Sequence, residues 1–221
     1  MPPHQFFDPV MFGVEFAYSI FVVIICLLIY IKTKSVYELT KHKGIQYFRN
    51  AFLFFGLAYI ARFMAHLFKI TNITFEFFIP MREIWPYVLM VTGYLSTIAI
   101  FYLIYSTIWE KIGHKQFLIF SNTIAIILAI IPVIFRSHLT LAVAQIILLL
   151  LAIVLNIIYH KKSSKHYQTK ALYFLILIFW LFNLALIGPG RLIPHELKII
   201  FQVISFALFL IIYYKVNKWI K

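Results

Sequence analysis

Charged residues are scarce in this chain, and acidic ones are the scarcest. Of the 221 residues only 12% are charged and only 7 are acidic, whereas 63% are hydrophobic. An ordinary soluble domain has about 25% charged and about 45 to 50% apolar residues, so this composition excludes one. Glycine and proline are also few, at 7 and 8 residues, which excludes collagen-like and disordered chains.

The only cysteine is Cys26, so the chain can form no internal disulfide and its cysteine content says nothing about a redox compartment. The segment before the first apolar run contains Asp8 but neither lysine nor arginine, so it lacks the basic region of a cleavable signal peptide. We therefore expect that first run to remain as a transmembrane helix.

Seven apolar runs of around 20 residues are present, and each is long enough to cross about 30 Å of hydrocarbon as a helix. The sequence predicts an all-α membrane protein, a seven-transmembrane-helix bundle that forms a single domain over residues 1–221. The helices are expected near residues 11–31, 48–68, 85–108, 117–135, 139–159, 171–188 and 197–214. Pro132 and the combined length of the fourth and fifth runs favour a tight hairpin over one long helix.

The basic residues alternate from one set of loops to the other. Fourteen of the 20 fall on one side of the membrane and five on the other, all in short loops or at helix ends. By the positive-inside rule the richer side is cytoplasmic, so we expect the N-terminus outside, the C-terminus in the cytoplasm and the chain in the cell membrane. The richer side holds Lys32, Lys34, Lys41, Lys43, Arg49, Lys111, Lys115, Lys161, Lys162, Lys165, Lys170, Lys215, Lys218 and Lys221.

The concentration of basic residues on one side of the membrane explains the net charge of +13, so no nucleic-acid partner is expected. Basic side chains facing anionic headgroups each contribute about 1 kcal/mol, and this lipid contact accounts for the cytoplasmic lysines. The alternative is that the first cytoplasmic loop, predicted over Thr33 to Tyr47, docks a cytoplasmic signalling partner.

The two halves of the chain show an internal similarity. Pro80, Arg82 and Pro86 precede or open the third helix, much as Pro189, Arg191 and Pro194 precede the seventh, and Trp109 and Trp219 follow these two helices at similar distances. Helices one to three and five to seven thus read as two parallel copies joined by helix four, a 3+1+3 repeat.

In architecture this plan resembles the microbial rhodopsins and the SWEET or PQ-loop sugar transporters. A rhodopsin would need a lysine in the middle of helix seven for retinal, but Lys198 and Lys215 lie only at its ends. PQ-loop proteins carry Pro-Gln pairs, and this chain has none. We therefore expect neither retinal nor another cofactor, and the resemblance stops at the helix plan.

Polar residues inside the predicted helices are the candidate site, because an ionisable group at mid-helix costs about 2.5 to 3.5 kcal/mol on insertion scales. Helix direction places six of them in the outer half of the membrane, where we expect a cavity that binds a small or lipidic ligand; these six are Glu15, Arg62, His66, Gln145, Asn183 and Gln202. The candidate ligand-binding residues are Glu15, Arg62, His66, Gln145, Trp180, Asn183 and Gln202. The other aromatic side chains are expected mostly to pack toward lipid.

A structural interpretation of the same residues stays open. Glu15 and Arg62 could form an ion pair or reach outward to water, and the amides could bond between helices for about 0.6 kcal/mol each. His66 is the only histidine within a helix interior. A metal or haem site across helices would therefore lack ligands, and no catalytic constellation is visible.

The leading functional hypothesis is a receptor-like or sensory membrane protein that binds its ligand in the outer half and passes a helix shift to a cytoplasmic partner. The alternative is a small-solute transporter or channel that uses the interface between the two three-helix copies. These hypotheses differ in whether polar residues continue past the middle of the membrane.

Overall fold

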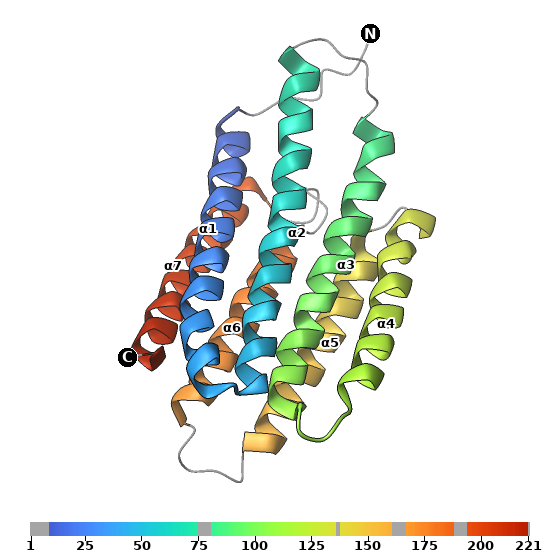
Figure 1. Ribbon diagram of the computed structural model, residues 1–221. Helices are drawn as coiled ribbons and strands as arrows, with labels where there is room; N and C mark the ends of the chain where they lie inside the picture. Colours follow the sequence, from blue (N-terminus) through green and yellow to red (C-terminus); the bar gives the residue numbers. More distant parts are fainter. Residues whose placement is uncertain (1–8, 75–80, 136–137, 161–166, 188–193, 221) are drawn as a thin grey trace.

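The computed structural model describes residues 9–74, 81–135, 138–160, 167–187 and 194–220, and every regular element in these ranges is an α-helix (Figure 1). The prediction of seven helices is confirmed for this part of the chain. The helices are α1 (Pro9–Thr40), α2 (Lys43–Thr74), α3 (Met81–Ile108), α4 (His114–Phe135), α5 (His138–His160), α6 (Tyr167–Ile187) and α7 (His195–Ile220).

Six of these helices are long and apolar enough to cross a membrane, namely all except α6. Helix α6 has 21 residues, and its apolar stretch within the described residues is the shorter Leu172–Leu184. The chain is therefore a helical membrane protein. The predicted break between the fourth and fifth helices is also confirmed, because α4 ends at Phe135 and α5 begins at His138.

Six helices form a ring in the order α1, α2, α3, α5, α6, α7, and α7 closes the ring against α1. Helix α4 lies outside the ring, where it packs against α3 and α5 (Figure 1). Neighbouring helices in the chain run in opposite directions, so α1, α3, α5 and α7 all finish at the same end of the bundle. We call this the basic end, because Lys41, Lys43, Lys111, Lys115 and Lys218 lie there. The opposite end is called the N-terminal end.

The predicted loop from Thr33 to Tyr47 is wrong. Helix α1 continues to Thr40 and α2 begins at Lys43, so only Lys41 and His42 connect them. Lys41 has a φ of 52°, the left-handed conformation that ends a helix and turns the chain. The end of an apolar run marks where the chain leaves the hydrocarbon of the membrane. The helix itself can continue beyond that point for as long as its backbone hydrogen bonds can form.

Phenylalanine side chains fill the centre of the ring. Phe52, Phe55, Phe179 and Phe209 form what we call the aromatic layer, with ring centroids 4.3 Å apart for Phe179 and Phe209 and 5.6 Å apart for Phe55 and Phe179. All four are at most 4% exposed. The expectation that aromatics mostly face lipid is wrong for these residues, because large flat rings fill the space between helices as well as they fill a lipid surface.

Candidate functional site

The side-chain amide of Asn183 lies at the centre of a polar cluster just above the aromatic layer, on its N-terminal side. Its Oδ1 accepts a hydrogen bond from the Tyr18 hydroxyl at 2.8 Å and another from the Tyr59 hydroxyl. Its Nδ2 donates to Ser205 Oγ at 2.9 Å and to the Phe179 carbonyl at 2.8 Å. These four bonds use the full capacity of the amide and join α1, α2, α6 and α7. We call Tyr18, Tyr59, Asn183 and Ser205 the Asn183 cluster.

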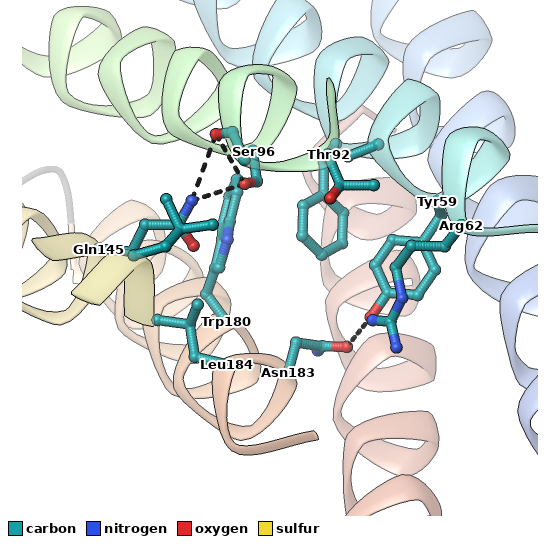
Figure 2. Close-up of a pocket in the computed structure, with 12 residues that line it drawn as sticks. Tyr59, Arg62, Thr92, Ser96, Gln145, Trp180, Asn183 and Leu184 are labelled. Atoms are coloured by element: carbon teal, nitrogen blue, oxygen red, sulfur yellow. Dashed lines mark hydrogen bonds between the residues drawn. The ribbon is translucent and has the colours of Figure 1, made fainter. Parts of the chain in front are cut away.

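The side-chain amide of Gln145 connects α5 to α3 by hydrogen bonds. Gln145, 1% exposed, donates from Nε2 to Ser96 Oγ at 2.6 Å and to Thr97 Oγ1 at 3.1 Å, with a longer contact of 3.4 Å to the Gly93 carbonyl (Figure 2). A Cβ at Gly93 would lie only 2.8 Å from Leu141 Cδ2 on α5. The absence of a side chain at Gly93 therefore lets the two helices approach closely enough for Gln145 to reach α3.

Arg62 lies between two small cavities and lines both. The first, which we call the Asn183 cavity, has a volume of about 20 Å³ and is also lined by Gln145, Trp180 and Asn183 (Figure 2). The second, which we call the Glu15 cavity, has about 10 Å³ and is also lined by Glu15, Tyr18, Ser19, Leu186, Lys198 and Gln202. A space of about 10 to 15 Å³ is needed for one water molecule, so both cavities are nearly closed.

The guanidinium of Arg62 has unused hydrogen-bonding capacity. Its Nη1 is buried without a hydrogen-bond partner, and so is Oε1 of Gln202 across the Glu15 cavity. Arg62 Cζ lies 5.2 Å from the centroid of the Tyr59 ring, a cation–π contact. Among the described residues no ion pair joins Arg62 to Glu15. Arg62 is partly buried, and a buried donor of a charged group that lacks a hydrogen-bond partner is costly. A negatively charged group in either cavity would lower that cost.

Six of the seven residues predicted from the sequence therefore lie around these two cavities. Arg62, Gln145, Trp180 and Asn183 line one, and Glu15 and Gln202 line the other together with Arg62. His66 is the exception. It lies one turn beyond Arg62, its ring stands edge-on to Phe12 at 5.5 Å, and it lines neither cavity.

Sequence reasoning missed the two tyrosines. The sequence predicts that Tyr18 and Tyr59 pack toward lipid like most aromatic residues, yet their hydroxyls donate hydrogen bonds to Asn183 in the interior. A signal was present, because each lies three residues from an ionisable residue on the same helix face, Tyr18 after Glu15 and Tyr59 before Arg62. Lys198, which the sequence places at the end of helix seven, also lines the Glu15 cavity.

The aromatic layer borders the Asn183 cluster on the side of the basic end. Phe55, Phe179 and Phe209 each lie one helical turn from a member of the Asn183 cluster, in the direction of the basic end. The Phe55 ring contacts that of Trp180 with centroids 4.4 Å apart, and the Phe52 ring stacks on that of Phe209 with centroids 6.3 Å apart. In the described structure the polar cavities are therefore closed toward the basic end by packed rings.

Comparison with known proteins finds one clear relation. The chain is 31% identical to a protein of Archaeoglobus fulgidus over an alignment that covers 98% of this chain and 94% of the relative. The chain belongs to the same family. That relative is described only as an uncharacterized protein, so the relation brings no activity with it. No family model matches the chain, and no solved structure matches it.

Proposed function

We propose that the protein is a receptor-like or sensory membrane protein whose ligand carries a negatively charged group to Arg62. The observation that supports this is the guanidinium of Arg62, which borders two polar cavities and has a buried Nη1 without a partner. A carboxylate or phosphate there would form charge-assisted hydrogen bonds. The remainder of a small or lipidic ligand would lie between the helices that enclose the cavities.

Because the cavities are small, binding of a ligand would require the helices around them to move. Spaces of about 20 and 10 Å³ are far below the roughly 300 to 1,000 Å³ of ordinary ligand sites. A ligand can enter only if helices of the Asn183 cluster separate, which changes the helix arrangement on binding. We propose that a cytoplasmic partner reads this change and that the protein itself carries out no catalysis.

A transporter or channel is the second candidate, and the two three-helix copies are its best support. The closed aromatic layer favours the receptor, because a solute route would have to pass Phe55, Phe179 and Phe209. Uptake of a labelled solute into proteoliposomes would reverse this preference.

The proposed topology has seven crossings, including α6, with the N-terminus outside and the basic end in the cytoplasm. At 21 residues and 1.5 Å per residue, α6 is long enough to cross. The helix neighbours support the 3+1+3 repeat. If α1 to α3 correspond to α5 to α7, the α3–α5 interface corresponds to α7–α1, and both are present. Gln145 bonds α5 to α3, as Tyr18 bonds α1 to α7.

The orientation can be tested with single cysteines at Thr71 and Ser35 in a Cys26→Ala background. We expect an impermeant thiol reagent to label Thr71→Cys on intact cells, because Thr71 is exposed near the N-terminal end of the bundle. Ser35→Cys, exposed near the basic end, should be labelled only after the cells are permeabilised. The opposite pattern would show that the basic end is outside.

The ligand site can be tested with two anionic probes, oleate for a lipidic ligand and benzoate for a small one. We expect at least one to bind the purified protein, and we expect Arg62→Gln to weaken that binding about tenfold or more, because a charge-assisted hydrogen bond contributes about 1.5 to 3 kcal/mol. Binding is measured by equilibrium dialysis of the labelled probe in detergent.

The matched control is Arg49→Gln. Arg49 is buried, but its guanidinium lies over the Tyr30 ring at 4.2 Å near the basic end, and it lines neither polar cavity. Its replacement should leave probe affinity unchanged. Equal affinity of the wild type and Arg62→Gln, or no binding of either probe, would remove the basis for the receptor proposal.

A further inference from the structure

A larger cavity lies at the basic end, among α2, α3 and α4, and is separate from the Arg62 site. Its volume is about 300 Å³, at the lower limit of ordinary ligand sites. Seven described residues line it, namely Lys43, Gln46, Tyr47, Asn50, Tyr102, His114 and Leu118. This size admits a small polar group without any movement of the helices.

The wall of this cavity is held in place by buried contacts. Tyr47 is 5% exposed, and its hydroxyl bonds Nδ1 of His114 at 2.9 Å. The Tyr47 ring lies edge-on to Tyr105 at 4.4 Å, and Tyr105 stacks on Phe117 at 3.9 Å. Because Nδ1 of His114 is engaged by Tyr47, Nε2 is the ring nitrogen that can face a ligand.

The lining is rich in hydrogen-bond donors and contains no carboxylate among the described residues. The ammonium of Lys43, the imidazole of His114, the amides of Gln46 and Asn50 and the hydroxyl of Tyr102 are all able to donate. Helix α2 begins at Lys43 and helix α4 begins at His114, so the positive ends of two helix dipoles also point to this region. The cavity is therefore suited to an anion.

We propose that this cavity binds a phosphate group. Lys43 supplies the positive charge, and His114, held by Tyr47, donates a hydrogen bond to a phosphate oxygen. The site lies where α2 and α4 begin, at the level where a membrane-spanning bundle meets lipid headgroups. The phosphate can therefore belong to a lipid headgroup or to a small soluble phosphate ester. The proposal does not depend on the function assigned to Arg62.

Two probes distinguish these sources with the full-length protein. Dioctanoyl phosphatidic acid is titrated into the protein in detergent and bound lipid is counted by native mass spectrometry. Glycerol 3-phosphate is titrated by calorimetry into the protein in phosphatidylcholine nanodiscs. We expect one of the two to bind, and we expect Lys43→Gln to weaken that binding about tenfold or more.

The control for charge alone is Lys218→Gln, which removes an exposed lysine from the same end of the bundle without touching the cavity. It should leave the affinity unchanged. A second variant, Leu118→Trp, fills the cavity without changing the charge and should abolish binding. The proposal is overturned if neither probe binds the wild type, if Lys43→Gln and Lys218→Gln weaken binding equally, or if Leu118→Trp binds normally.

Discussion

Replacing Asn183 by alanine is expected to lower the free energy of unfolding by about 3 kcal/mol. The change removes four hydrogen bonds at once and leaves the hydroxyl of Tyr59, which is 2% exposed, without its acceptor. Hydrogen bonds between membrane helices average about 0.6 kcal/mol each, and a buried group left unsatisfied costs about 1 to 3 kcal/mol more. Unfolding of the purified protein by SDS in mixed micelles, followed by circular dichroism, measures the difference.

Asn122→Ala is the matched comparison. Asn122 on α4 accepts one bond from the Tyr94 hydroxyl at 2.6 Å and is only partly buried. Its loss should cost less than about 1 kcal/mol, since one bond joins two helices at the edge of the bundle. If both alanine variants unfold at the same SDS fraction, the Asn183 cluster is not the main polar connection among α1, α2, α6 and α7.

The second large effect is expected for Phe179→Ala in the aromatic layer. Phe179 is 1% exposed and contacts the rings of both Phe55 and Phe209. Removing a buried phenylalanine side chain costs about 3 kcal/mol or more, through lost contacts and the cavity that remains. The same SDS titration should show this loss. The vacated space would also open a way from the Asn183 cavity toward the basic end, so proteoliposomes of this variant should leak protons faster than those of the wild type.

Phe174→Ala provides the control on the same helix. Its side chain is 56% exposed on the outside of the bundle, where lipid can fill the space that the ring leaves. We expect a change in unfolding free energy below about 0.5 kcal/mol and no leak. Similar losses for the two variants would mean that the aromatic layer is no more tightly packed than the surface.

The helices could be predicted from sequence more fully than their ends. Apolar runs indicated seven helices because the cost of unpaired backbone groups in lipid requires each run to be helical. The extension of α1 to Thr40 could not be found in this way, because Lys32 to Thr40 is polar and hydropathy records only the hydrocarbon. In that segment helix propensity and packing against α2, rather than lipid, decide the conformation.

The residues of the candidate site that could be predicted are those whose side chains would be costly to expose to lipid. Arg62, Gln145 and Asn183 stood out because an amide or a charge facing lipid is expensive. Their partners could not be named, because the order of helices around the ring is set by packing. Tyr18 and Tyr59 could not be singled out, because tyrosine is also common at the membrane interface, where it needs no buried partner. The basic-end cavity was missed because its cationic residues were already explained by headgroup contact.

The position of α4 outside the ring bears on how such a chain could arise by gene duplication. A unit of three helices ends on the opposite side of the membrane from where it begins, so a second copy fused directly to it would insert upside down. One additional crossing restores the direction of the second copy. If the chain holds the proposed 3+1+3 repeat, helix α4, which packs against α3 and α5, is the crossing that gives the second copy the same direction as the first. Because α4 forms no part of the ring, we expect its outward face to tolerate substitutions better than the inward faces of the six helices that enclose the cavities.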